Sequence, residues 1–164
     1  MFRKCAVVLA LGAAMVLGSG DGVAAQGRGA GGGRGGPPMT PLLYRQHIMQ
    51  HLQESMQDLT AIRGGTAGAS SHVLARATII QQLATMLPDA FPANSGGEGS
   101  RSLPLVWENA TELTARIQAT RTAADALLEA ARGGNAEAIG TAQQGLQQTC
   151  GACHMQFRGP APGA

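Results

Sequence analysis

The sequence is poor in lysine, in aromatic residues and in long apolar runs, and each shortage excludes a class of protein. Lys4 is the only lysine, and aromatic residues make up 3% of the 164 positions. With no basic run and almost no aromatic surface, the chain offers no support for nucleic-acid binding. Its longest apolar run, from Cys5 to Leu17, is too short for a membrane span, which needs about 20 residues.

Runs of β-branched residues are also scarce, whereas alanine is abundant, and this composition favours helices. No strand-like alternation of apolar and polar residues competes with that interpretation. Residues 26–164 are enough for one domain with one core. They are close to neutral, with ten arginines against nine acidic residues. The sequence therefore predicts a single all-α domain.

The first 25 residues have the features of a secretory signal. Arg3 and Lys4 supply the positive region, the apolar run follows, and the small residues 23–25 supply a cleavage site before Gln26. We expect residues 1–25 to be removed on export to the periplasm, with an uncleaved N-terminal anchor as the alternative. Cys5 lies within the apolar run, before the small residues, so we do not interpret it as a lipid-attachment site.

The other two cysteines belong to the motif Cys150-Gly151-Ala152-Cys153-His154. C-x-x-C-H is the attachment signature of c-type haem, in which both thiols bond to the porphyrin and the histidine is the proximal ligand of the iron. A zinc site would need a second ligand pair, and a thioredoxin-like dithiol would need a βαβ pattern; the sequence has neither. We therefore expect one haem c, bound through Cys150 and Cys153 with His154 as metal ligand, and no disulfide.

Glycine- and proline-rich segments flank a central region, 40–158, in which apolar residues recur at helical spacing. Residues 26–39 predict a flexible leader, because they cannot bury apolar surface, and residues 159–164 predict a disordered tail. Four helices are expected between them, at 41–63, 72–87, 104–133 and 136–157. Thr40 and Asn135 are the N-caps expected for the first and the last helix.

Apolar stripes of alternating four- and three-residue spacing run along all four segments, which predicts an antiparallel up-down-up-down four-helix bundle. On the first helix the stripe consists of Arg45, Met49, Leu52, Met56 and Leu59. In this topology the first helix starts beside the end of the last, so Met49 would face the haem. The second and third helices would supply the hydrophobic walls there: Leu83, Met86, Leu87, Val106 and Trp107.

Four segments resemble the cytochrome c prime family, and the likeness covers essentially the whole domain. They are Tyr44-Arg45-Gln46-x-x-Met49, Leu87-Pro88-x-x-Phe91-Pro92, Leu103-Pro104-x-x-Trp107 and Cys150-x-x-Cys153-His154-x-x-Phe157-Arg158. The resemblance implies a four-helix bundle with one haem at one end, and often a homodimer built from the first two helices. It also implies that Arg45 pairs with a haem propionate, with an arginine that snorkels into solvent as the alternative.

The family has two branches, which differ in the residue one turn after this arginine. An apolar residue there leaves the iron five-coordinate and open to nitric oxide or carbon monoxide, whereas a methionine supplies a sixth ligand. Met49 occupies the position, so the resemblance favours the low-spin branch, with Met49/His154 ligation and one-electron transfer between redox partner proteins. The alternatives are a methionine that only fills the core, a gas-binding or nitric-oxide-scavenging cytochrome, or a structural or sensory haem domain.

His47 and His51 are four residues apart, a spacing that can hold a metal. They share a face with Glu54 and Asp58, away from Met49, so we expect them to be solvated, with surface metal capture as the alternative. No nucleophile–base pair and no helix-borne distal acid accompanies the haem motif, so the sequence predicts no enzyme. Contact with a membrane is expected to be transient at most.

Overall fold

A computed structural model describes residues 38–161, and its long elements are all helices. In chain order they are α1 Pro41–Arg63, α2 His72–Thr85, the 3-10 helix η1 Leu87–Ala90, α3 Leu105–Glu108, α4 Ala110–Gly133 and α5 Ala136–Phe157. Within this range the only strand-like pairing is an isolated bridge between Ser102 and Arg158. The predicted signal segment and the leader up to residue 37 lie outside the described residues.

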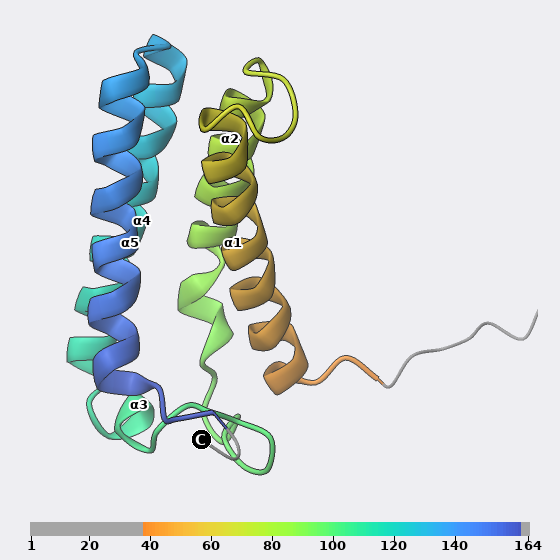
Figure 1. Ribbon diagram of the computed structural model, residues 1–164. Coiled ribbons are helices and arrows are strands. Elements are labelled where there is room, and N and C mark those ends of the chain that lie inside the picture. Colours follow the sequence, from red (N-terminus) through yellow and green to blue (C-terminus); the bar gives the residue numbers. More distant parts are fainter. Residues whose placement is uncertain (1–37, 162–164) are drawn as a thin grey trace, which may run out of the picture. The chain divides into compact units, whose positions relative to one another are not determined.

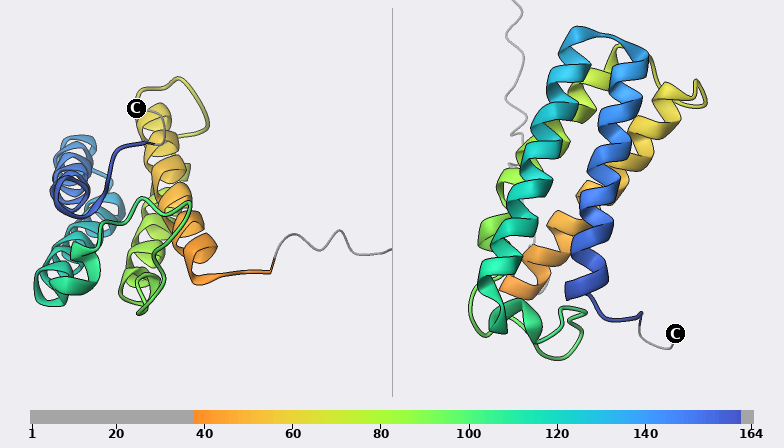
Figure 2. Two further views of the ribbon diagram at one scale, coloured as in Figure 1. Left: turned by 90° about the horizontal axis from the view of Figure 1, so that it is seen from below. Right: turned by 90° about the vertical axis from the view of Figure 1, so that its left-hand side faces the viewer.

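The four long helices stand side by side as an up-down-up-down bundle (Figures 1 and 2). α1 packs on α2, α2 on α4, and α4 on α5, whereas no extensive packing joins α1 to α5. α1 begins and α5 ends at the same end of the bundle, where α3 also lies (Figure 1). The predicted all-α antiparallel four-helix bundle is confirmed.

Side-chain caps set the helix starts that the sequence predicted. Oγ1 of Thr40 accepts a hydrogen bond of 3.2 Å from the amide of Leu43, and Oδ1 of Asn135 accepts one of 2.9 Å from the amide of Ala138. Caps of this kind satisfy amides that have no partner inside the helix, and each contributes about 1 kcal/mol. The starts of α1 and α5 are therefore fixed by local chemistry.

The third predicted helix, 104–133, is two helices in the structure, because the chain breaks at Asn109. Its backbone has φ −124° and ψ 62°, and its Oδ1 accepts a hydrogen bond of 3.3 Å from the amide of Glu112. A short amide side chain competes for backbone N–H groups, which interrupts a helix that apolar spacing alone would continue. The prediction of one continuous helix was wrong, and Asn109 is the N-cap of α4.

The largest fully buried side chains come from every long helix and from α3: Leu59, Ile80, Leu127, Leu146 and Val106. They belong to one continuous apolar cluster. Removing an aliphatic side chain of this size from water contributes roughly 1.5–3 kcal/mol. This core holds the helices in place around the space between α1 and α5.

α1 has two inner faces rather than the single stripe that the sequence predicted. Its buried residues are Arg45, Ile48, Ser55, Leu59 and Ile62. Met49, Leu52 and Met56 are only half-buried, and they line a cavity. Consecutive residues of a helix lie about 100° apart around its axis, so Ile48 is buried in the core while Met49 faces the cavity.

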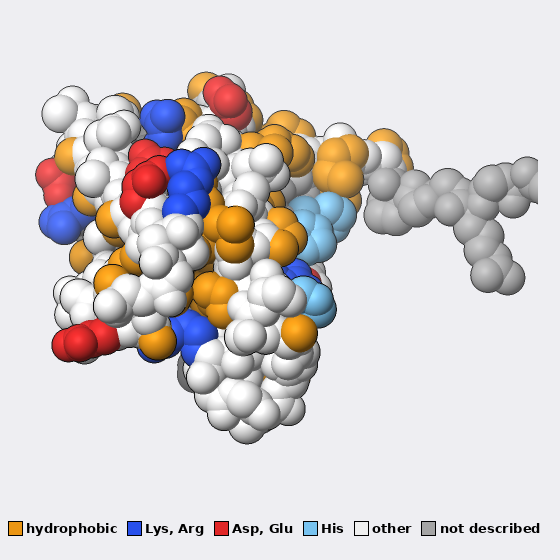
Figure 3. Space-filling model, turned by 90° about the horizontal axis from the view of Figure 1, so that it is seen from above, with side chains coloured by type: hydrophobic (Ala, Val, Ile, Leu, Met, Phe, Trp, Pro, Cys, Tyr) orange, Lys and Arg blue, Asp and Glu red, His pale blue; other side chains and the backbone are white. Residues whose placement is uncertain are grey.

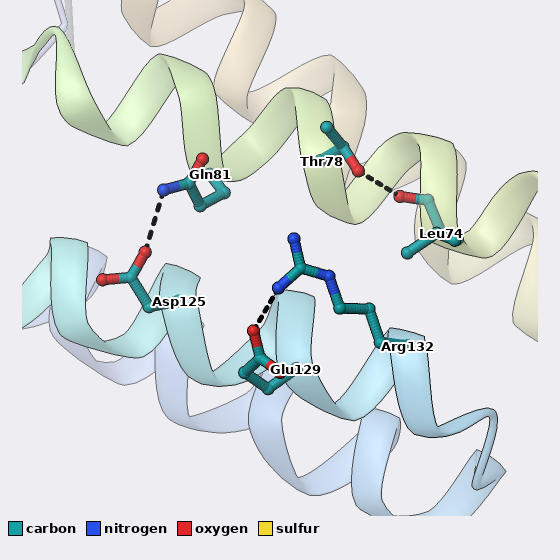
Figure 4. Close-up of polar contacts among 6 residues, drawn as sticks. All are labelled: Leu74, Thr78, Gln81, Asp125, Glu129 and Arg132. Atoms are coloured by element: carbon teal, nitrogen blue, oxygen red, sulfur yellow. Dashed lines mark hydrogen bonds and ion pairs between the residues drawn. The ribbon is translucent and has the colours of Figure 1, made fainter.

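On the face shown in Figure 3, charges of both signs are interspersed with uncharged and apolar side chains. Between α2 and α4, Nε2 of Gln81 donates a hydrogen bond of 2.9 Å to Oδ1 of Asp125, and Arg132 pairs with Glu129 along α4 (Figure 4). Exposed contacts of this kind contribute only about 0–1 kcal/mol, so the apolar core determines the fold. None of the helices within residues 38–161 has the length and hydropathy needed to cross a membrane.

Candidate functional site

A cavity of about 950 Å³ separates α1 from α5. From α1 it is lined by Leu42, Arg45, Met49, Leu52 and Met56, together with four glutamines, Glu54 and Thr60, and from α5 by Leu146, Cys150, Cys153, His154 and Phe157. Cofactor and ligand pockets have volumes of about 300–1,000 Å³, so the cavity is large enough for a cofactor. The space explains why α1 and α5 do not pack against each other.

Cys150 and Cys153 lie one turn apart near the end of α5, half-buried at this cavity, and neither forms a disulfide. Burial raises the pKa of both thiols, and the neighbouring Cys150 raises that of Cys153 further. Residues three apart on a helix share one face. Both sulfurs can therefore bond to a single ligand on the cavity side of α5, as covalent haem attachment requires.

His154 follows directly and lines the same cavity. Burial lowers the pKa of its imidazole, and the positive charges of Arg158 and Arg101 lower it further. The neutral imidazole is the form that ligates a metal ion. The two thiols and this imidazole therefore fit a c-type haem.

Backbone pairing fastens the end of α5 to the loop before α3. The amide of Leu103 donates a hydrogen bond of 2.9 Å to the carbonyl of Phe157, and the amide of Gly159 donates one of 2.7 Å to the carbonyl of Arg101. The Arg101 guanidinium in turn donates to the carbonyls of Gly159 and Pro160, at 2.8 and 3.1 Å. The predicted disordered tail, 159–164, therefore starts too early, because these two residues are held in place.

Met49 projects from α1 into the cavity that His154 lines from α5. The sequence placed both residues at one end of the bundle, and the structure brings them to one cavity. Met56, two turns further along α1, lines the cavity as well and is half-buried, although the sequence placed it in the core. Two thioethers thus face the space between the helices.

Arg45 is buried, with a 4% exposed side chain, and its guanidinium bonds to the loop that follows η1. Nη1 donates to the carbonyl of Ala90 and to Oγ of Ser95, at 3.1 and 2.9 Å, and Nη2 donates to the carbonyl of Ser95 and to Oγ of Ser100, at 2.7 and 3.1 Å. The alternative of an arginine that snorkels into solvent is therefore wrong. The four N–H bonds of the terminal nitrogens are all used, which leaves the Nε–H for a propionate.

Aromatic rings flank the same guanidinium. Its central carbon lies 5.4 Å from the ring centroid of Phe91 and 6.0 Å from that of Trp107, within the range of cation–π attraction. Nε1 of Trp107 donates a hydrogen bond of 2.9 Å to the carbonyl of Pro92. The loop after η1 is thus packed around Arg45, which gives it a defined shape beside the cavity.

Of the predicted hydrophobic walls, only Leu87 lines the cavity. Met86 is 40% exposed, and Leu83, Val106 and Trp107 are not among the lining residues. The structure supplies other walls, which the sequence did not assign to the haem pocket: Ala84, Phe91, Ile117 and Thr120. Because α2 ends at Thr85, the residues beyond it do not continue the apolar stripe of that helix, as the prediction had assumed.

A polar group that the sequence did not reveal joins α1 to α5 away from the haem motif. Nη1 of Arg63 donates a hydrogen bond of 2.6 Å to Oε1 of Gln143, and Nε2 of Gln143 donates one of 2.7 Å to Oγ1 of Thr60. Gln143 is buried, with 3% of its surface exposed. Glutamine and arginine are common on exposed helix surfaces, so the sequence held no signal that Gln143 and Arg63 would meet.

His47 and His51 are exposed on α1, as predicted, and neither lines the cavity. They lie about half a turn around the helix from Met49. His72 is exposed at the start of α2. No described histidine other than His154 reaches the cavity, so a bis-histidine haem does not fit this arrangement.

Fold and site together define a helical c-type cytochrome, and comparison with known proteins agrees. The sequence profile of the Cytochrome C' family matches residues 40–158. The cytochrome c' of Pararhodospirillum photometricum is 31% identical over 116 residues, which cover 70% of this chain and 93% of that protein. A cytochrome c-554 of Cereibacter sphaeroides is 31% identical over 93 residues, 55% of this chain and 56% of the relative.

Solved structures show the same bundle. The cytochrome c prime of Alcaligenes xylosoxidans, solved in variants with nitric oxide or carbon monoxide bound, has a TM-score of 0.67 and 21% identity. The match covers 73% of this chain and 94% of that one. The chain belongs to the cytochrome c prime family, and its cofactor is one covalently bound haem c.

Proposed function

We propose that this chain is an exported mono-haem cytochrome that binds nitric oxide or carbon monoxide at the iron face turned toward α1. The observation that carries the proposal is the composition of the cavity. Its α1 wall offers the iron no imidazole and no thiol: the thioethers of Met49 and Met56 stand among hydrocarbon and amide side chains, with Arg45, Glu54 and Thr60 as the other polar groups. A distal face without a strong ligand suits gas binding.

The residues that would surround the haem come from two helices. On α5, Cys150 and Cys153 would hold the porphyrin and His154 would ligate the iron, with its neutral form favoured by burial. On α1, Leu42 and Leu52 place hydrocarbon on the opposite side of the cavity. When bound, the haem supplies an iron atom that takes a diatomic gas or exchanges one electron.

The gas complexes of the Alcaligenes xylosoxidans protein support this proposal. They belong to a protein of the same fold and only 21% identity, so they show what the bundle can accommodate. The proposal makes this chain a binding protein rather than an enzyme. Export is supported by the signal-like residues 1–25, and periplasmic delivery would place the haem where thioether bonds form.

A second candidate function is one-electron transfer with Met49 as sixth ligand, and the position of Met49 favours it. Met49 and His154 line one cavity from facing helices, as axial ligands on the two sides of a haem would. A thioether ligand raises the reduction potential and closes the site to gases. Redox partner proteins would then dock at the haem end of the bundle.

The optical spectrum of the purified protein distinguishes gas binding from one-electron transfer with Met49 as ligand. We expect a broad, high-spin spectrum of the dithionite-reduced protein that changes on addition of carbon monoxide. A sharp low-spin α band that carbon monoxide leaves unchanged would contradict gas binding and support Met49 as ligand. Colourless protein would contradict both.

Self-association is a further part of this proposal. Ile79 and Met86 are apolar side chains with about 40% exposure on the α2 side of the bundle, where the family resemblance implies a homodimer. Sedimentation of wild-type protein and of Ile79→Lys tests this. The expected result is a dimer that the charged side chain dissociates, whereas a wild-type monomer would contradict it.

A further inference from the structure

His47 and His51 form a pair on the outer face of α1 that the haem site does not use. Their ring centroids lie 6.3 Å apart, with the planes tilted by 59°. Both side chains are exposed. Two imidazoles four residues apart on a helix can ligate one metal ion.

Glu54 contacts one of the two rings. Its Oε2 lies 3.5 Å from Nδ1 of His51, and its Oε1 accepts a hydrogen bond of 2.9 Å from Nε2 of Gln50. A carboxylate beside Nδ1 favours the tautomer with the proton on that nitrogen, which leaves the lone pair on Nε2. Gln50 holds Glu54, and Glu54 lies beside Nδ1 of His51, so Nε2 of His51 is available to an ion.

Only a small movement separates the pair from ligation. A metal about 2.1 Å from one nitrogen of each ring brings the ring centroids to roughly 5 Å, about 1 Å closer than they are. The side chain of His51 is 59% exposed, so the rings can rotate without displacing packed residues. The described residues hold no cluster of three histidine, cysteine or acidic ligands, so water would complete the coordination shell.

We propose that His47 and His51 bind a divalent transition-metal ion, Cu(II) in preference to Zn(II), with Glu54 positioning His51. Imidazole suits copper, nickel and zinc, and for a given nitrogen site copper binds most tightly. Calcium and magnesium require oxygen ligands, which this pair lacks. Neither His47 nor His51 lines the haem cavity, although Gln50 and Glu54 are among its lining residues, and the metal site does not depend on gas binding.

The test is titration of the purified full-length protein with Cu(II), followed by electron paramagnetic resonance and calorimetry. We expect one copper ion per chain at this site, with nitrogen hyperfine structure. His47→Ala and His51→Ala should each weaken binding at least tenfold, because two-point attachment is lost. Glu54→Gln should weaken it by about tenfold, in the range found for residues that orient a ligand.

His72→Ala is the matched control, because His72 is also exposed at a helix surface but has no described histidine one turn away. It should leave copper binding unchanged. Equal binding by His47→Ala and wild type would overturn the site, as would equal loss in His72→Ala. Copper held by Cys150 and Cys153 would persist in every histidine variant and is distinguished in that way.

Discussion

Met49 of α1 and His154 of α5 line one cavity, although the helices that carry them share no extensive packing. The half-buried α1 side chains that face this space, Met49, Leu52 and Met56, are therefore less constrained by packing than the core residues are. Whatever occupies the cavity joins α1 to α5 where direct contact is missing. The chemistry of the site then depends on which α1 side chain approaches the iron.

Met49→Leu tests that dependence, since it removes the thioether and keeps a side chain of similar volume. Under gas binding we expect the same high-spin spectrum, and an affinity for carbon monoxide changed by less than about threefold, because no bond to iron is lost. The measurement is the reduced spectrum with and without carbon monoxide. Met56→Leu, which alters the other thioether of the cavity, is the control and should change neither property.

A conversion from low-spin to high-spin on Met49→Leu would give the opposite answer. It would show that Met49 ligates the iron, and the electron-carrier hypothesis would replace gas binding. If both variants changed the spectrum equally, the effect would come from repacking of the cavity instead of ligation.

The sequence predicted the elements that are governed by local chemistry. Thr40 and Asn135 cap helices because a short polar side chain before a periodic run satisfies free amides wherever the rest of the chain lies. The haem motif is likewise a local signature, because its three side chains act within two turns of one helix. These features are encoded in residues that are close along the chain.

Features that depend on partners distant in sequence were not predictable. The guanidinium of Arg45 meets Ser95 and Ser100, at least 50 positions away, and no spacing rule connects them. Met49 and Met56 fit an apolar stripe equally well whether they face a core or a cavity. Only the separation of α1 from α5 distinguishes the two, and that is a tertiary property.

Arg45→Met should loosen the loop that follows η1. Without the guanidinium, the carbonyls of Ala90 and Ser95 lose their donors, and we expect the free energy of unfolding to fall by about 2–3 kcal/mol. Urea unfolding measures the loss, and limited proteolysis should show faster cleavage near Asn94. Arg45→Lys should recover little of this stability, since an ammonium group cannot reach all of these acceptors.

The control is Arg132→Met, because Arg132 is 57% exposed and its partner Glu129 is 68% exposed. That change should alter stability by less than about 0.5 kcal/mol. Unchanged stability in Arg45→Met, together with loss of haem, would instead mean that Arg45 acts mainly on the cofactor.

Alanine substitutions at two glycines of α5 test how much the contact between Arg63 and Gln143 contributes to stability. A Cβ at Gly145 meets no neighbour, so Gly145→Ala should raise the free energy of unfolding by up to about 1 kcal/mol through helix propensity. A Cβ at Gly140 would overlap Nη2 of Arg63 and displace it from Gln143. For an exposed arginine that loss is worth about 1 kcal/mol, so Gly140→Ala should have little net effect. Equal stabilisation by both substitutions in thermal unfolding would show that the contact contributes nothing.

Alkylation in denaturant tests the covalent attachment at Cys150 and Cys153. Burial and the raised thiol pKa slow alkylation of the folded chain, so the protein must be unfolded first. We expect no adduct at either residue and an intact mass that includes one haem, because both sulfurs are consumed in thioether bonds. An adduct at Cys5 would separately report that the signal segment is retained. Two adducts at Cys150 and Cys153 in a colourless protein would contradict the haem assignment, whereas Cys150→Ser should leave a haem held by Cys153 alone.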